Sequence, residues 1–166
     1  MDNELPPAPE EMQQMAWFIG EWEVVSRFLN KEGEWIEEHL RAEHSYVLGG
    51  HTIFEHFGGP VFQMPFEGWS LRKYNTTEKR WEQRWVDVSA GGFADWTGHW
   101  DADSKTFTGY ANRTLDEEGK PKETAVREVF SDISAQSFAW RFERTTDNGQ
   151  SWTVSWTLDY TRRAAV

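Results

Sequence analysis

The sequence predicts an all-β protein, an antiparallel up-and-down barrel of about ten strands preceded by one short helix. From Gly20 almost to the last residue, apolar and polar side chains alternate with a period of two, which is the period of a strand. Short segments rich in Gly, Asn and Asp separate these stretches and supply hairpin turns. No strand–helix–strand rhythm is present, and a closed barrel accommodates so many consecutive strands without leaving an unpaired edge.

The elements follow in order along the chain. Residues 1–8 are expected to form a disordered leader because prolines interrupt regular structure there. A short amphipathic helix is predicted over 9–18 from apolar residues at spacings of three and four, and Gly20 ends it. These apolar residues are Met12, Met15, Ala16 and Ile19. The strands are predicted at about 22–29, 35–47, 52–58, 66–74, 81–88, 93–100, 106–112, 124–130, 137–145 and 152–161. We therefore expect one barrel domain over 9–163, followed by a tail over 164–166.

Composition argues against several classes of function. The chain has 17 basic and 28 acidic side chains, a net charge of −11, which opposes binding to nucleic acid or to a membrane surface. Cysteine is absent, so disulfides, thiolate nucleophiles and Cys-ligated metals are excluded. No secretory signal is visible, and no apolar stretch reaches the roughly 18 residues of a membrane span, so we expect a soluble, cytoplasmic protein. A homodimer stays open as an alternative to a monomer.

Alternate residues of a barrel strand face the interior, so the phase of each strand selects candidate site residues. In 81–88 the Trp residues share one face with Gln83 and Asp87, opposite a charged face, and we expect this face to point inward. In 66–74 we expect Trp69 inward and Glu67 near the barrel mouth. The residue pattern does not decide which face of 52–58 or of 93–100 points inward, although in 93–100 the face that carries Trp96 is favoured. The predicted ligand-binding residues are Trp69, Trp81, Gln83, Trp85, Asp87, His44, Tyr46 and Trp96.

An interior rich in Trp predicts a carrier or sensor for a small hydrophobic or aromatic ligand, held by stacking and burial. Gln83, Asp87 and His44 would fix the orientation of that ligand. The same rings would also serve simply to fill a wide barrel. The alternative is a cofactor-free enzyme of isomerase, cyclase or lyase type, whose acid–base groups would be His44, Asp87, Glu67 and Arg127. Asp87 could equally form a structural ion pair with Arg127 or His44.

No metal site and no cofactor is predicted. His39 and His44 are five residues apart, as are His51 and His56, so the members of each pair point to opposite faces of a strand. A haem-binding barrel in which His44 ligates the iron is kept as a second alternative.

Gly20-Glu21-Trp22 after a short helix resembles the opening of lipocalin-like (calycin) barrels, and Tyr160-Thr161-Arg162-Arg163 resembles their closing strand. The middle of the chain is similar to a bacterial domain-of-unknown-function family of such barrels, and the match covers roughly residues 12–163. The resemblance implies the barrel fold and a cavity for a small apolar or amphipathic ligand, with no established reaction. The Gly-rich repeat of nitrobindin-like haem barrels is missing at Glu23-Val24-Val25. The motifs in the middle are Leu48-Gly49-Gly50, Met64-Pro65-Phe66-Glu67-Gly68, Asn75, Trp85-Val86-Asp87 and Gly91-Gly92.

Overall fold

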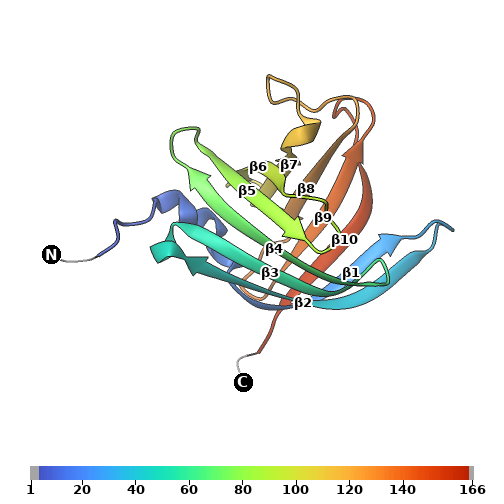
Figure 1. Ribbon diagram of the computed structural model, residues 1–166, viewed down its shortest axis with the longest axis horizontal. Helices are drawn as coiled ribbons and strands as arrows, with labels where there is room; N and C mark the ends of the chain where they lie inside the picture. Colours follow the sequence, from blue (N-terminus) through green and yellow to red (C-terminus); the bar gives the residue numbers. More distant parts are fainter. Residues whose placement is uncertain (1–3, 165–166) are drawn as a thin grey trace.

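Ten antiparallel strands form a closed barrel in the computed structural model of the chain, which describes residues 4–164 (Figure 1). Each strand pairs with its neighbour in sequence, and β1 (Gly20–Leu29) closes the sheet by pairing with β10 (Thr153–Arg162). The predicted all-β antiparallel barrel is confirmed. The other strands are β2 (Trp35–Val47), β3 (Thr52–Val61), β4 (Met64–Asn75), β5 (Arg80–Asp87), β6 (Ala94–Asp101), β7 (Thr106–Ala111), β8 (Ala125–Ser131) and β9 (Ser137–Thr145).

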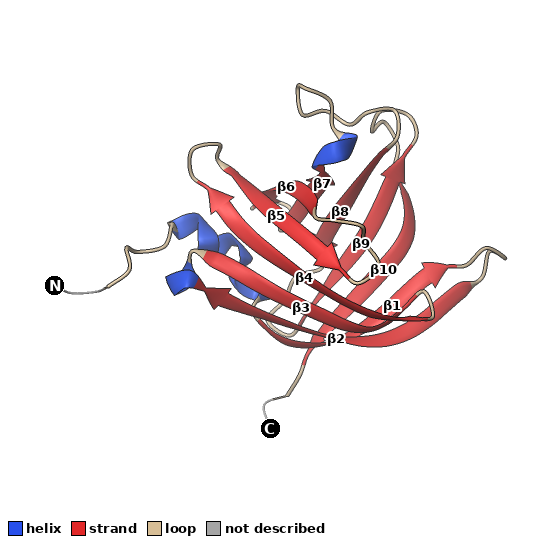
Figure 2. Ribbon diagram, in the orientation of Figure 1, coloured by secondary structure: helices blue, strands red, loops and turns tan. Residues whose placement is uncertain are grey.

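The leading helix, η1 (Glu10–Phe18), consists of two 3₁₀ pieces joined by a kink at Met15 (φ −114°, ψ 21°), and it covers one end of the barrel (Figure 2). A 3₁₀ helix has three residues per turn, so Met12, Met15 and Phe18 fall on one face, and all three are buried. Of the other two residues expected on the apolar face, Ala16 is exposed because a step of four residues from Met12 leaves that face, and Ile19 lies beyond the end of the helix. Two further 3₁₀ turns, η2 (Leu48–Gly50) and η3 (Asn112–Thr114), follow β2 and β7.

Residues 4–8, which belong to the expected leader, have no regular secondary structure but contact η2 and the turn after it. His51 Nε2 donates a hydrogen bond to the Pro6 carbonyl oxygen at 2.8 Å. Residues 1–3 of the expected leader and 165–166 of the expected tail lie outside the described residues. No helix within 4–164 has both the length and the apolar character needed to cross a membrane.

The seam between β1 and β10 explains the Gly-x-Trp motif. Gly20 has a φ of +139°, and a Cβ atom at this position would overlap Nη1 of Arg162. That guanidinium lies over the Trp22 indole, 4.3 Å from the ring centroid, and donates a hydrogen bond to the Ile19 carbonyl at 2.9 Å. Trp22 is fully buried and donates from Nε1 to the Phe18 carbonyl at 3.0 Å. The motif therefore fastens η1 to both strands of the seam.

The barrel interior is filled with aromatic rings at the end that η1 covers. Phe18 packs edge-on against Phe130 with centroids 5.6 Å apart, and Phe138 stacks on Tyr160 at 4.2 Å. Trp22 packs edge-on against Phe138 at 4.7 Å. This end of the barrel is therefore a closed core, and any room for a ligand lies toward the other end.

Candidate functional site

A cavity of about 490 Å³ occupies the end of the barrel away from η1. Its wall comes from the β3–β4 turn, the end of β5 and the start of β6, together with the middle of β9 and β10. The volume lies within the range of roughly 300–1,000 Å³ that is usual for small-molecule sites. The apolar part of the wall consists mainly of Phe57, Val61, Phe62, Phe66, Trp85, Trp96, Phe130, Trp140, Phe142, Trp156 and Leu158.

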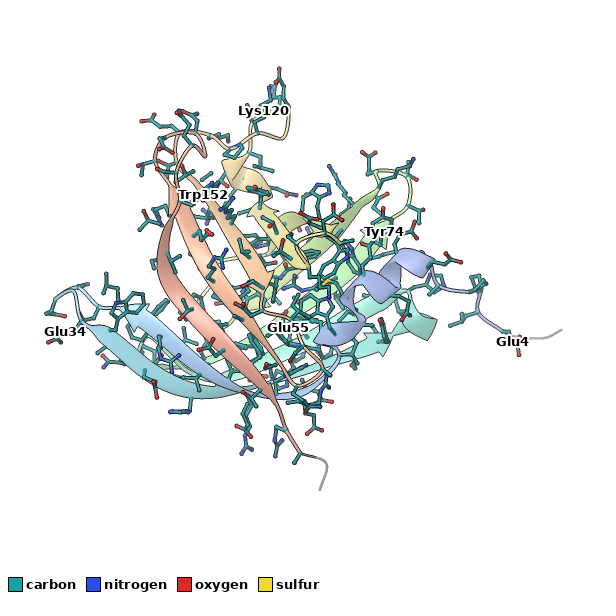
Figure 3. All side chains as sticks on the ribbon, turned by 180° about the vertical axis from the view of Figure 1, so that it is seen from behind. Glu4, Glu34, Glu55, Tyr74, Lys120 and Trp152 are labelled. Atoms are coloured by element: carbon teal, nitrogen blue, oxygen red, sulfur yellow. The ribbon has the colours of Figure 1, made fainter. Side chains whose placement is uncertain are left out.

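Arg72 of β4 projects into the middle of the interior, where only 3% of the residue is exposed. Its Nη1 donates to Oε1 of Glu128 at 2.9 Å, and its Nη2 lies 3.5 Å from Oε2 of Glu55. Ser70 Oγ donates to Oε2 of Glu55 at 2.6 Å, and Trp140 Nε1 donates to Oε2 of Glu128 at 3.0 Å. Figure 3 shows Glu55 in the middle of the barrel. One guanidinium between two carboxylates thus forms the polar floor of the cavity.

The charged groups of this floor stabilise one another's ionised forms. Burial alone would raise the pKa of the Glu55 carboxyl, but the His44 ring, the Arg72 guanidinium and the Ser70 hydroxyl together lower it to about 2. Burial alone would lower the pKa of Arg72, but the two carboxylates outweigh it and raise that pKa. Burial and the charge of Glu55 raise the pKa of Tyr160 well above its usual value, so its phenol stays neutral.

Two buried polar atoms of the cavity-lining residues have no hydrogen-bond partner among the described residues, Nε of Arg72 and Oε1 of Gln83. Arg72 and Gln83 face each other across the β4–β5 pairing, and both residues line the cavity. Buried polar atoms in proteins are nearly always paired, so an open donor next to an open acceptor is unusual. Neither atom has accessible surface as the side chains stand, so a ligand can pair with them only after the Arg72 and Gln83 side chains turn toward the cavity.

Asp87 lies at the cavity mouth, and its carboxylate is already occupied. Oδ2 accepts from Trp85 Nε1 at 2.7 Å, and Oδ1 accepts from the Ser89 backbone, the Ser89 hydroxyl and the Ala90 backbone at 2.8, 2.6 and 2.9 Å. Burial would raise the pKa of Asp87, but these hydrogen bonds lower it. Asp87 therefore orients the Trp85 indole and holds the loop after β5. The expected ion pair with Arg127 or His44 is not formed.

His44 is buried at the covered end, outside the cavity wall. Its ring stacks on Phe18 with centroids 3.6 Å apart, Nδ1 donates to the Phe18 carbonyl at 2.7 Å, and Nε2 lies 3.5 Å from Oε1 of Glu55. Both nitrogens are directed at protein groups, an arrangement that does not suit haem ligation. Among residues 4–164, no group of three or more His, Asp or Glu side chains is placed to hold a metal ion.

Tyr46 and Trp81 also contact η1. Tyr46 Oη donates to the Met12 carbonyl at 3.2 Å, and Trp81 Nε1 donates to Oε1 of Gln14 at 3.0 Å. Trp81 is buried and faces inward, but it packs against Phe107 below the main cavity. These two predicted ligand contacts therefore lie where they hold the helix over the barrel end.

Three predicted site residues point away from the interior. The expected inward orientation of Trp69 is wrong, and neither Glu67 nor Arg127 lines the cavity. Trp69 is half exposed and packs on Phe54 outside the barrel, and Glu67 accepts a hydrogen bond from exposed His56 at 3.0 Å. Arg127 lies on the outer face of β8, 3.2 Å from a carboxylate oxygen of Glu143. In β4 most inward positions belong to small or charged residues, and the apolar side chains of Trp69 and Leu71 are on the outside. These inward residues are Phe66, Gly68, Ser70 and Arg72.

The sequence did not decide which face of β3 or of β6 points inward, and in the structure each of these strands lines the cavity with one face. In β3 Glu55, Phe57 and Val61 line the cavity, whereas Phe54 and His56 lie outside. In β6 Trp96 lines the cavity, on the favoured face. Of the predicted ligand-binding residues, the cavity wall contains Gln83, Trp85, Asp87 and Trp96.

The mouth of the cavity is partly covered by the tip of the β3–β4 hairpin. Phe62 and Gln63 both have positive φ, 51° and 63°, and their backbone N–H groups donate to the buried Glu38 carboxylate of β2 at 3.0 and 2.6 Å. The Phe62 ring packs edge-on against Phe28 at 4.8 Å and lies 5.1 Å from Trp156. Glu38 thus compensates for an unfavourable backbone conformation that keeps Phe62 over the cavity.

We expect Glu38→Gln to lower the free energy of unfolding by about 1–3 kcal/mol, because an amide offers one acceptor where two N–H groups require them. Urea unfolding measures the loss, and hydrogen exchange at the Phe62 and Gln63 amides should become faster. Glu37→Gln is the matched control, since Glu37 is exposed and pairs with Arg27 on the outer face at 3.1 Å. The control should change stability by less than about 0.5–1 kcal/mol. Equal losses in the two variants would contradict this account of the turn.

The closed barrel, the covering helix and the internal cavity define the class of the protein as a lipocalin-like β-barrel. Within that class, the chain belongs to the family described as "Protein of unknown function (DUF1579)", whose model matches residues 8–162. The expected resemblance to a domain-of-unknown-function family of lipocalin-like barrels is confirmed. None of the curated proteins matches the chain.

Several solved structures are similar to the chain, including the following two. Rv2717c from M. tuberculosis has a TM-score of 0.64 and 12% sequence identity, over 95% of this chain and 99% of its own. The S-type phycobiliprotein lyase CPES from Guillardia theta has a TM-score of 0.58 and 11% identity, over 93% of each chain. At such low identity the likeness is one of fold.

Proposed function

We propose that the protein binds a small, mainly apolar molecule inside the barrel and acts as its carrier or sensor. The observation that carries the proposal is the cavity of about 490 Å³, open at one end and lined by aromatic side chains around an ion cluster. Protein interiors are ordinarily filled to crystal-like density, so a space this large among apolar walls favours a bound molecule. The existence of a phycobiliprotein lyase with this fold supports the inclusion of a bilin among the ligands to be tested.

The acid–base alternative has less support, because its four candidate groups do not converge. His44 is sealed beneath the cavity, Asp87 is saturated with hydrogen bonds at its mouth, and Glu67 and Arg127 lie outside the barrel. A reaction needs such groups within hydrogen-bond reach of one bound molecule. A binding protein requires only the cavity.

Four of the 11 Trp residues line the cavity, so tryptophan emission reports directly on its contents. We expect at least one member of a panel of apolar, aromatic and bilin compounds to change the emission. A ligand at a hundred times its Kd should add about 2.7 kcal/mol to stability and raise Tm. The lining Trp residues are Trp85, Trp96, Trp140 and Trp156.

A variant that fills the cavity separates internal from external binding. Ala94 lines the cavity, so Ala94→Phe should abolish the emission change and the Tm shift. Ala102→Phe, in the exposed β6–β7 turn, is the matched control and should leave both unchanged. Absence of any response across the panel, or an equal response in Ala94→Phe, would count against the proposed function.

A further inference from the structure

The polar floor of the cavity restricts the chemistry of the ligand, if the proposed binding function holds. We infer that the ligand is uncharged at its inner end. It joins an aromatic body to one group that both accepts and donates hydrogen bonds, as a carboxamide, a lactam or an alcohol does. A carboxylate does not meet this requirement.

Charge is the first reason. Arg72 would be the obvious partner for an anionic ligand, but Glu128 lies 2.9 Å and Glu55 3.5 Å from its guanidinium nitrogens. The three groups carry one positive and two negative charges, so a ligand carboxylate would add a third negative charge to a buried site. Asp87 and the exposed Arg113 both line the cavity as well, so they add one charge of each sign and leave the negative balance of the buried floor unchanged. Burial of a charge without an available counter-ion is strongly unfavourable.

Hydrogen-bonding capacity is the second reason. The oxygens of Glu128 accept from Arg72 and Trp140, and Oε2 of Glu55 accepts from Ser70. Among the cavity-lining residues one buried donor and one buried acceptor are left without a partner, Arg72 Nε–H and Gln83 Oε1, on neighbouring strands. Once these two side chains turn toward the cavity, a carboxamide can offer its oxygen to the first and its N–H to the second. A carboxylate has no hydrogen to donate to Gln83, and a hydrocarbon leaves both groups unpaired.

The aromatic side chains of the cavity wall indicate which kind of group forms the main part of the ligand. Phe66 and Trp85 lie nearly parallel on one side of the cavity, with an angle of 13° between ring planes and 6.3 Å between centroids. Trp96 and Phe142 pack together on another side, with centroids 6.4 Å apart. Rings arranged in this way offer faces and edges to a flat aromatic group.

Three probes with one aromatic body test the inference on the unaltered protein at neutral pH. They are naphthalene-2-carboxamide, 2-naphthoate and 2-methylnaphthalene, each titrated by tryptophan emission or calorimetry. We expect the carboxamide to bind at least about tenfold more tightly than either of the others, since two satisfied buried hydrogen bonds are at stake. Naphthoate should bind most weakly. Equal or tighter binding of naphthoate would overturn the inference.

Gln83→Met removes the open acceptor at similar volume. In this variant the preference for the carboxamide over 2-methylnaphthalene should fall at least several-fold. Gln13→Met on the exposed side of η1 is the control and should keep the full preference. A preference that survives in Gln83→Met would overturn the inference, and if that variant does not fold, the three-probe comparison still decides.

These experiments distinguish a wrong ligand class from a wrong binding function. Binding of 2-methylnaphthalene that Ala94→Phe abolishes, with no preference for the carboxamide, would overturn the ligand class and leave the proposed cavity function standing. Failure of all three probes together with the bilin panel would overturn the binding function, and the ligand class with it.

Discussion

Replacing Arg72 with methionine is expected to lower the free energy of unfolding by about 3–5 kcal/mol, the largest effect of any single substitution considered for this chain. The variant would keep an apolar side chain of suitable length but would leave Glu55 and Glu128 buried without their cation. Urea unfolding at neutral pH measures the difference. A loss below about 1 kcal/mol would mean that the cluster is not held together by charge.

A compensated variant serves as the control for this experiment. Arg72→Met combined with Glu55→Gln and Glu128→Gln removes all three charges while keeping the approximate volumes. Because replacing a whole buried ion cluster is often close to neutral, the triple variant should recover most of the lost stability. No recovery would indicate that the loss in the single variant comes from packing around the guanidinium.

Lowering the pH should decrease the stability of the protein but increase that of the Arg72→Met variant. In the protein the pKa of Glu55 is lowered from 4.5 to about 2, so its contribution is complete above pH 4.5 and is lost as the pH falls toward 2. In the variant the buried carboxyls no longer have a cation, and protonation relieves them. The stability difference between the two should therefore shrink as the pH falls through this range, which unfolding curves at a series of pH values can test.

Gly20→Ala is expected to cost about 2–4 kcal/mol, combining backbone strain with displacement of a side chain. A φ of +139° is open to glycine and strained for alanine, and the new methyl group would occupy the place of Arg162 Nη1. The guanidinium would have to leave the Trp22 ring and the Ile19 carbonyl, which weakens the seam as well as the hold on η1. Thermal and urea unfolding measure the loss.

Gly33→Ala separates the two contributions. Gly33 also has a positive φ, +82°, but a Cβ there would meet no heavy atom within 4 Å. This variant should lose only about 1–2 kcal/mol from backbone conformation. A loss in Gly20→Ala no greater than that in Gly33→Ala would show that the overlap with Arg162 is relieved without cost.

The fold could be predicted from the sequence because the features that define it are local. Alternation and turn residues fix where a strand begins and ends, and the expected bounds of 35–47 and 137–145 agree with those of β2 and β9. The helix type was harder to predict, since Met12 and Met15 fit both helical periods. Only the burial of Phe18 and the exposure of Ala16 distinguish the 3₁₀ form.

The polar centre of the site could not be predicted by the rule that apolar residues face inward. In β4 that rule places Trp69 inside, whereas Ser70 and Arg72 are buried and Trp69 is half exposed. A barrel can bury charged residues when other strands supply counter-charges, and a single strand carries no information about such partners. One signal was present in the sequence. Glu55 and Glu128 each have apolar residues two positions away on both sides, a pattern that places them on an inward face.

The seam between β1 and β10 also has a consequence for how the chain folds. Arg27 and Asp159, which form an ion pair across it, are 132 residues apart in the sequence. Contacts between such distant residues form slowly, so ring closure should be a late, rate-limiting event in folding. Until it occurs, β1 and β10 each present an open edge, and the aromatic interior is accessible to other chains. Refolding at high protein concentration should therefore give aggregates in competition with the native barrel.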